Sequence, residues 1–151
     1  MARTSPLRVL IVEDEPLLAM DIEMMVADSG HSVVGEAASL HDVEAMAVDV
    51  APDLAFVDMH LARNTNGLDV STLVQQRWPE TIIVFVTANP KMIPDGFAGA
   101  HGVIPKPFSR NGFMSAIQFL SEGIVAPPPV TPRPASFTVA QTLLDNWQRG
   151  V

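Results

Sequence analysis

The stretch LRVLIVEDEP (Leu7–Pro16) joins a nearly unbroken apolar run to three acids and a proline. Strands that are buried on both faces of a parallel sheet contain such runs, because helices cover the sheet from both sides. Similar runs lie at Leu54–Val57 and Ile82–Val86, and weaker candidates lie at Ser32–Gly35 and Val103–Ile104. The sequence therefore predicts a sheet of five short strands.

Helical patterns separate these apolar runs. Four stretches have apolar residues at helical spacing, and three of them also have a residue that suits a cap or a first turn. They begin at Pro16, after Ser39, at Gly67 and after Ser109. The second of these helices is expected to continue to Val50, because its apolar residues share one face as far as that position.

The stretch 90–100 is different, because two prolines and two glycines interrupt it and disfavour a regular helix. The alternation of strands and helices predicts an α/β fold with a five-stranded parallel sheet, helices on both faces and an irregular fourth helix. The flavodoxin-like strand order 2-1-3-4-5 is expected for a sheet of this size.

The composition of the chain changes after Gly123. Five prolines between residues 124 and 136 predict an extended linker, and residues 138–149 form one short candidate helix. We expect a folded domain over residues 1–123, followed by this linker and helix over residues 124–151. A helix this short is not stable alone in water, so its apolar side should pack on the chain's own surface or on a neighbouring subunit.

The charge and composition disfavour several classes of partner. The formal net charge is −8, and the chain has only two lysines and no basic cluster, so nucleic acids and anionic membrane surfaces are not expected as partners. There is no cysteine, which excludes disulfides and thiolate metal sites. No apolar run is long enough to span a bilayer, and the start MARTSPLRVL lacks the apolar stretch of a signal peptide. A cytoplasmic location is therefore expected.

Three carboxylates are predicted to meet at one edge of the sheet. In open α/β sheets, ligands bind at the carboxyl ends of the strands, where the strand order reverses. For the order 2-1-3-4-5 that point lies between the first strand, which ends in Glu13-Asp14, and the third strand, which ends in Asp58. Carboxylates this close repel one another, so a hard divalent cation, with magnesium the usual choice beside phosphate, is expected to bind them.

The remaining strand ends add two complementary groups. Thr87 closes the fourth strand with a hydroxyl, and Lys106 follows the fifth strand with an ammonium. A carboxylate, a cation, a hydroxyl and a positive charge together can accept a phosphoryl group and neutralise the charge of its transfer. Each residue alone is ordinary at its position, but their joint placement at the ends of different strands indicates phosphoryl transfer.

Four segments of the chain carry these residues and resemble the signature blocks of response-regulator receiver domains, over about residues 6–122. The blocks are Val9–Glu15 (VLIVEDE), Asp53–Asp58 (DLAFVD), Val86–Ala88 (VTA) and Lys106–Phe108 (KPF). The resemblance implies that Asp58 is the phosphoacceptor and that Thr87 and Lys106 contact the phosphoryl oxygens. It also implies a cis peptide bond between Lys106 and Pro107.

The resemblance further implies a cofactor and a mode of action. Mg²⁺ or Mn²⁺ would be held by Glu13, Asp14, Asp58 and the backbone carbonyl of His60. The chain would act as a chemotaxis-regulator-like single-domain receiver in a two-component system or phosphorelay, with signalling through protein–protein contacts. A sensor histidine kinase or a histidine phosphotransfer protein would supply the phosphoryl group. No enzymatic activity is expected beyond the chain's own phosphorylation and dephosphorylation, and a homodimer is left open.

One residue departs from the usual sequence pattern of receivers, and two others occupy positions that affect how long the phosphoryl group persists in that family. Val103 stands where many receivers have Tyr or Phe, so an aromatic switch at this position is not expected. His60 and Asn89 occupy positions that tune the lifetime of the phosphoryl group in that family.

Three other functions remain open from the sequence. A magnesium-dependent phosphohydrolase would also use Asp58, but it commonly needs a second acid where this chain has His60. A flavin or nucleotide module of the same architecture would need a first loop that cradles phosphate, whereas Glu13-Asp14-Glu15 would repel it. The chain could also be the receiver end of a longer regulator, because its proline-rich segment resembles an interdomain linker.

Overall fold

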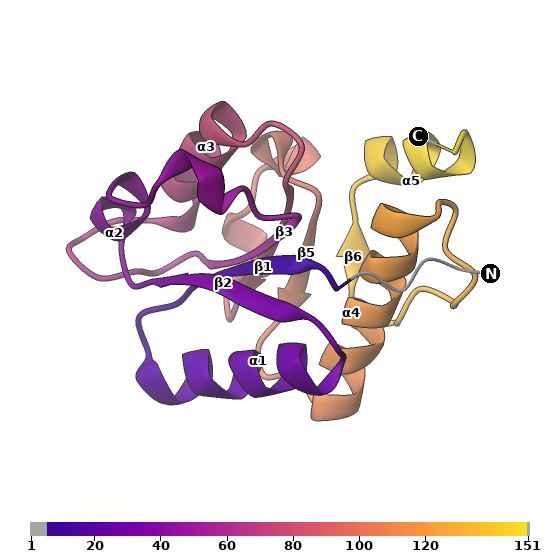
Figure 1. Cartoon of the computed structure of the whole chain (residues 1–151), viewed down its shortest axis with the longest axis horizontal. Coiled ribbons are helices and arrows are strands. Elements are labelled where there is room, and N and C mark those ends of the chain that lie inside the picture. Colours follow the sequence, from indigo (N-terminus) through magenta and orange to yellow (C-terminus); the bar gives the residue numbers. More distant parts are fainter. Residues whose placement is uncertain (1–5, 151) are drawn as a thin grey trace.

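Five parallel strands form most of the sheet, and their order, 2-1-3-4-5, is the predicted one (Figure 1). The computed structural model describes residues 6–150. The parallel strands are β1 (Arg8–Val12), β2 (Ser32–Ala37), β3 (Leu54–Asp58), β4 (Ile82–Thr87) and β5 (Gly102–Pro105). A sixth strand, β6 (Thr138–Val139), pairs antiparallel with β5 and was not expected from the sequence.

Helices cover both faces of the sheet, as predicted (Figure 1). The helices α1 (Pro16–Asp28) and α4 (Arg110–Val125) lie on one face, and α2 (Leu40–Glu44) and α3 (Gly67–Arg77) lie on the other. Successive strand residues point to opposite faces of the sheet. In β1, Ile11 therefore packs with apolar residues of α1 and α4, and Leu10 packs with apolar residues of α2 and α3. Within residues 6–150, no helix has the length and apolar character needed to cross a membrane.

The predicted caps are present. Ser39 Oγ accepts a hydrogen bond from the N–H of Asp42, and Ser109 Oγ accepts one from the N–H of Gly112. Pro16 occupies the first turn of α1, where its missing N–H has no helical partner to lose. These local features explain why the helices begin where the sequence indicates.

The predicted continuation of the second helix to Val50 is wrong. Helix α2 ends at Glu44, and a separate 3₁₀ turn, η1, spans Val48–Val50. Arg77 Nη1 donates hydrogen bonds to the carbonyl oxygens of Val43 (2.9 Å), Glu44 (3.2 Å) and Met46 (3.0 Å). Carbonyl groups at the end of a helix lack some of their helical partners, so this long-range contact from α3 stabilises the early stop.

The segment between β4 and β5 is irregular, as predicted. It contains two 3₁₀ turns, η2 (Pro90–Met92) and η3 (Asp95–Gly99), in place of a regular α-helix. Gly96, Phe97 and Ala98 have φ angles of 78°, 58° and 51°, which no right-handed helix contains.

The region after residue 123 packs on the chain's own core. Its helix, α5, spans Gln141–Gln148, so the prediction of a helix from residue 138 is partly wrong. Val139 belongs to β6 because the backbone there pairs with the otherwise free edge of β5. Phe137 and Trp147 are buried in the same cluster as α1 and α4. The boundary at residue 123 stays a prediction about which part folds alone.

We expect Arg77→Met to lower the free energy of unfolding by about 2–3 kcal/mol, because the three carbonyls at the end of α2 lose a charged donor. Urea denaturation of the two proteins measures this difference. Arg110→Met is the matched control, because its exposed ion pair with Asp28 should contribute about 1 kcal/mol or less. Equal losses in both variants would contradict the capping role of Arg77.

Candidate functional site

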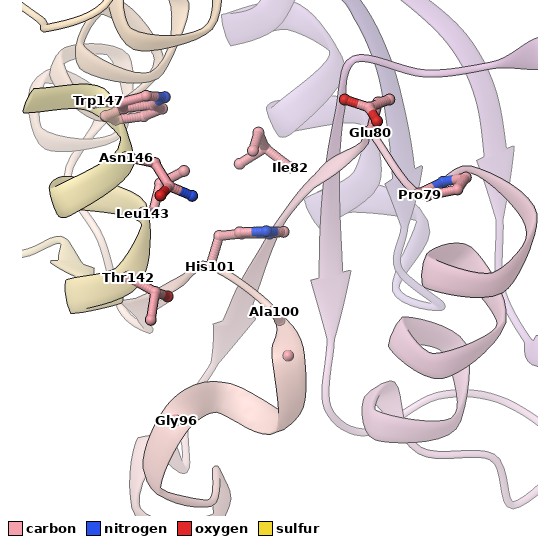
Figure 2. Close-up of a pocket in the computed structure, with 11 residues that line it drawn as sticks. Pro79, Glu80, Ile82, Gly96, Ala100, His101, Thr142, Leu143, Asn146 and Trp147 are labelled. Atoms are coloured by element: carbon pink, nitrogen blue, oxygen red, sulfur yellow. The ribbon is translucent and has the colours of Figure 1, made fainter. Parts of the chain in front are cut away.

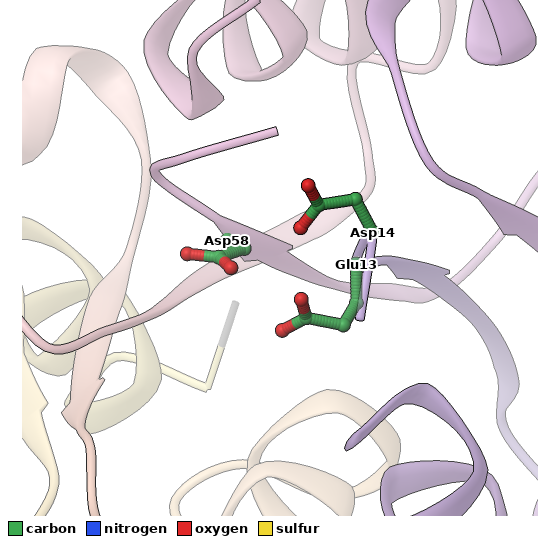
Figure 3. A group of neighbouring side chains, drawn as sticks. All are labelled: Glu13, Asp14 and Asp58. Carbon is green, nitrogen blue, oxygen red and sulfur yellow. The ribbon is translucent and has the colours of Figure 1, made fainter. Parts of the chain in front are cut away.

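Three carboxylates lie together at the carboxyl edge of the sheet (Figure 3). Glu13 and Asp14 follow β1, and Asp58 ends β3, the strand beside it. One carboxylate oxygen from each residue lies within 4.8 Å of the others. Glu13 and Asp58 are buried, whereas Asp14 is exposed. The predicted meeting of these three residues is therefore observed.

Lys106 brings a positive charge to the cluster from the end of β5. Its Nζ donates to Asp58 Oδ2 at 3.0 Å and to Glu13 Oε1 at 3.1 Å. Glu15 Oε2 lies farther away, at 4.0 Å, on a largely exposed side chain. Lys106 thus links the ends of β1, β3 and β5. The peptide bond between Lys106 and Pro107 is cis, as expected.

Burial raises the pKa of Glu13 to about 7. A hydrogen bond from the N–H of Glu15 and the charge of Lys106 oppose this shift, while the neighbouring charge of Asp58 adds to it. Burial also acts on Lys106 and lowers its pKa, but the hydrogen bonds and charges of Asp58 and Glu13 outweigh it, so the pKa of Lys106 is raised. Lys106 therefore stays charged, while Glu13 holds its proton more tightly than an exposed glutamate.

Thr87 lies at the end of β4, one residue beyond Val86, which pairs with Asp58. Its buried hydroxyl oxygen accepts a hydrogen bond from the N–H of Asn89. The side-chain amide nitrogen of Asn89, Nδ2, lies 3.3 Å from the ring nitrogen Nε2 of His60. The backbone N–H of His60 donates a hydrogen bond to Asp58 Oδ1. A chain of contacts therefore connects the loop after β4 with the Asp58 carboxylate.

Gly67 lies against Asp58, although the sequence analysis predicted only that a helix begins at this glycine. A Cβ atom at this position would clash with the backbone carbonyl of Asp58, so only glycine lets the start of α3 approach the strand end so closely. The N–H of Gly67 also donates to the carbonyl oxygen of Met59. The only feature of the sequence that could have indicated this close approach is a glycine directly after Asn66, which caps the start of α3.

The arrangement fits a divalent cation. When all are ionised, three carboxylates and the single ammonium of Lys106 leave two net negative charges within a few ångströms. Carboxylate oxygens are the ligands that Mg²⁺ and Mn²⁺ prefer. Glu13, Asp14 and Asp58 could each supply one ligand atom, and Lys106 would remain beside Asp58 to meet a bound anion. Chemically, the site can hold a cation and present a carboxylate to an electrophilic phosphorus.

The family model described as "Response regulator receiver domain" matches residues 9–118. The chain is also similar to the transcriptional regulatory protein PdtaR of Mycobacterium tuberculosis, with 31% identity over 115 residues. That match covers 75% of this chain and 56% of PdtaR, so the chain spans about half the length of this relative.

Solved structures of PhyR proteins are similar to this chain in both fold and sequence. The receiver domain of PhyR from Erythrobacter litoralis has a TM-score of 0.66 and 26% identity, over 78% of this chain and 91% of that one. The anti-anti-sigma factor PhyR from Bartonella quintana has a TM-score of 0.61 and 32% identity, over 74% of this chain and 46% of that one.

The raised pKa of Glu13 predicts a pH-dependent stability in the absence of metal. The folded chain holds the proton of Glu13 more tightly than the unfolded chain, in which the pKa of this residue is near 4.5. The protonated residue therefore stabilises the fold fully below about pH 4.5, and this stabilisation is lost as the pH rises through about 7. Relative to Glu13→Gln, the wild type should lose about 1–3 kcal/mol of unfolding free energy between about pH 5 and pH 8. Urea denaturation with a chelator at each pH measures the loss.

The comparison between the two proteins is needed because Glu36 also has its pKa raised to about 7, by a hydrogen bond with Glu23. Both proteins retain that pair, so it cancels in the difference. A difference between wild type and Glu13→Gln that stays constant from about pH 5 to pH 8 would show that Glu13 does not titrate in this range.

Proposed function

The chain belongs to the response regulator receiver domain family, and on that premise we propose that it is a phosphoryl-accepting response regulator of a two-component system or phosphorelay. The observation that supports this most is the buried Asp58 carboxylate, which contacts Lys106 and lies within 4.8 Å of Glu13 and Asp14. In this proposal, an acceptor, a positive charge and a cation site lie together at the carboxyl edge of the sheet, where β1, β3 and β5 end.

In the proposed reaction, a carboxylate oxygen of Asp58 attacks the phosphorus of a phosphorylated donor. A carbon–oxygen–phosphorus linkage forms, the bond from phosphorus to the donor atom breaks, and its electron pair leaves with the donor. Lys106 already binds an Asp58 oxygen, so its ammonium is within reach of the oxygens of a phosphoryl group attached there. Thr87 is the hydroxyl candidate for a second contact, because it ends the strand next to β3.

Glu13, Asp14 and Asp58, with the backbone carbonyl of His60, would hold Mg²⁺ or Mn²⁺ in this proposal. When bound, such a cation neutralises the charge that accumulates on the transferred group. The chain's own residues position the acceptor: the N–H of His60 and the ammonium of Lys106 each bind one of its two oxygens. The proposed activity is confined to the chain's own phosphorylation and dephosphorylation.

The phosphoryl donor is proposed to be a sensor histidine kinase or a histidine phosphotransfer protein that docks on α1. Leu17, Met20 and Met24 are 81%, 55% and 52% exposed at helical spacing on this helix. A cavity of about 370 Å³ lies between α1 and Lys106, lined by Leu18, Asp21, Ala88, Lys106, Pro107 and Phe108. Exposed apolar residues at helical spacing suit the docking of a partner helix that delivers the phosphoryl group.

We expect a small phosphodonor with Mg²⁺ to add one phosphoryl group to the wild type and none to Asp58→Asn, because an amide is a poor nucleophile. Intact-protein mass spectrometry measures the addition. Asp49→Asn is the matched control, since this exposed aspartate lies on η1, and it should be phosphorylated normally. Asp14→Ala should lose the dependence of the reaction on Mg²⁺. Phosphorylation of Asp58→Asn to the wild-type extent would place the acceptor elsewhere.

Met20→Glu should slow phosphoryl transfer from the cognate kinase about tenfold or more, because a charge in the middle of the exposed apolar stripe opposes docking. Its phosphorylation by a small-molecule donor should not change. Transfer assays with both donors measure the two rates. Val48→Glu places the same charge on another exposed apolar residue, on η1, and should leave both rates unchanged. Equal slowing of Met20→Glu with both donors would argue against a docking role.

A further inference from the structure

His101, the residue directly before β5, binds the backbone of β4 through two groups. Its backbone N–H donates a hydrogen bond to the carbonyl oxygen of Ile83 at 2.9 Å, and its ring nitrogen Nδ1 accepts one from the N–H of Ile83 at 2.9 Å. The carbonyl oxygen of His101 accepts a third hydrogen bond, from the N–H of Ala140 at 2.8 Å, just before α5. His101 therefore joins β4, β5 and the C-terminal helix at one point.

The hydrogen bond from Ile83 fixes where the imidazole ring of His101 carries its proton. Nδ1 can accept a hydrogen bond only when it has no proton, so the neutral ring carries its proton on Nε2. A doubly protonated imidazole has two donors and no acceptor. Protonation of the ring would therefore set two N–H groups against each other, and the bond between Ile83 and the ring would be lost.

Asp53 shows that another type of acceptor can hold the same arrangement. This residue directly precedes β3, and its N–H donates to the carbonyl oxygen of Arg8 at 2.8 Å while its Oδ2 accepts the N–H of Arg8 at 2.9 Å. A carboxyl group keeps an acceptor oxygen whether or not it is protonated, whereas a histidine loses its acceptor on protonation. The position before a strand therefore does not require histidine, and histidine makes the junction at β5 sensitive to pH.

Burial keeps the ring of His101 neutral. The residue is half-buried, and burial lowers its pKa below the ordinary value of 6.5. The unfolded chain binds this proton at a higher pH than the folded chain. The neutral ring therefore stabilises the folded junction above about pH 6.5, and this stabilisation is lost as the pH falls through the lower pKa of the folded state.

A cavity of about 300 Å³ gives the ring of His101 room to move. The cavity lies between α5 and the amino ends of β4 and β5, and Figure 2 shows His101 between the side chains of α5 and that of Glu80. Among the described residues that line the cavity, Glu80 is the one besides His101 that can carry a charge, and Thr142 and Asn146 add polar groups from α5. A ring that turned away from Ile83 would enter a space with a carboxylate on its far side, which favours the protonated form.

We propose that His101 is a pH-sensitive switch at the junction of β4, β5 and α5. In its neutral form the ring binds the N–H of Ile83, and in its protonated form the ring leaves this bond and turns into the cavity towards Glu80. The charged ring then lies beside the apolar side chains of Leu143 and Trp147, which weakens the packing of α5 on the sheet. The switch does not depend on phosphorylation of Asp58.

The test measures hydrogen exchange of the Ile83 amide in the full chain by NMR, with protection factors corrected for the effect of pH on unprotected amides. In the wild type, the protection of Ile83 should fall about tenfold between about pH 7 and pH 5, because the open junction binds a proton that the closed junction does not. His101→Asn is the matched variant, since its side-chain oxygen can replace Nδ1, as the oxygen of Asp53 does before β3, but does not titrate. The protection of Ile83 in this variant should change less than about twofold.

His31 provides the control for a general effect of removing a histidine. It directly precedes β2, at the opposite edge of the sheet, and its Nδ1 accepts the N–H of Leu7 at 3.0 Å. His31→Asn should therefore leave the pH dependence at Ile83 as it is in the wild type. Glu13 and Glu36, whose pKa values are raised, are present in all three proteins, so their titration cancels in the comparison.

An NMR titration of the ring of His101 needs no variant at this position. The ring nitrogens of the wild type should show the proton on Nε2 at about pH 7, and the ring should titrate with a pKa below 6.5. Glu80→Gln should lower this pKa further, because the protonated ring then has no carboxylate to turn towards.

The outcomes are distinct. The proposal is overturned if the protection of Ile83 depends on pH no more in the wild type than in His101→Asn, or if the ring of His101 titrates at or above 6.5. A pKa that Glu80→Gln leaves unchanged overturns the movement of the ring towards Glu80. A failure of Asp58 phosphorylation would count against the proposed function alone.

Discussion

The ion pairs of Lys106 with Asp58 and Glu13 are the interaction on which the site depends. A parallel sheet brings the carboxyl ends of its strands to one edge, and here that edge receives three carboxylates within 4.8 Å of one another. Burial and, to a smaller extent, the charge of Asp58 raise the pKa of Glu13, and the ammonium of Lys106 opposes part of this shift. When its carboxylates are ionised the site carries a net negative charge, which fits a divalent cation, and the Asp58 carboxylate contacts a positive group.

The structure around the site is arranged to keep Asp58 in place. Gly67 lets α3 approach the carbonyl of Asp58, the N–H of His60 binds one carboxylate oxygen, and Lys106 binds the other. By contrast, the segment after Thr87 has no regular helix, and its 3₁₀ turns contain left-handed residues. The contacts around Asp58 therefore lie beside a segment that has few helical hydrogen bonds to lose if it rearranges.

The edge of the sheet next to the site has a different role. Lys106 directly follows β5, while the outer edge of this strand pairs with β6. Edge strands attract other extended chains, and here a short strand with buried aromatic residues on either side of it covers that edge. Strand β5 therefore leads to Lys106 at the site and holds the C-terminal residues of the chain at its outer edge.

The sequence alone determined the parallel strand order, the caps at Ser39 and Ser109, the irregular segment 90–100 and the convergence of Glu13, Asp14 and Asp58. These follow from local propensity and from the geometry of parallel sheets, both of which are readable along the chain. Only the tertiary structure decided where α2 ends, why position 67 is glycine, and where residues 130–148 pack. Each of these depends on contacts between residues far apart in sequence: Arg77 with the carbonyls of α2, α3 with the carbonyl of Asp58, and Trp147 with Gly123. Such contacts leave no periodic signal, because either partner alone looks like an ordinary surface or loop residue.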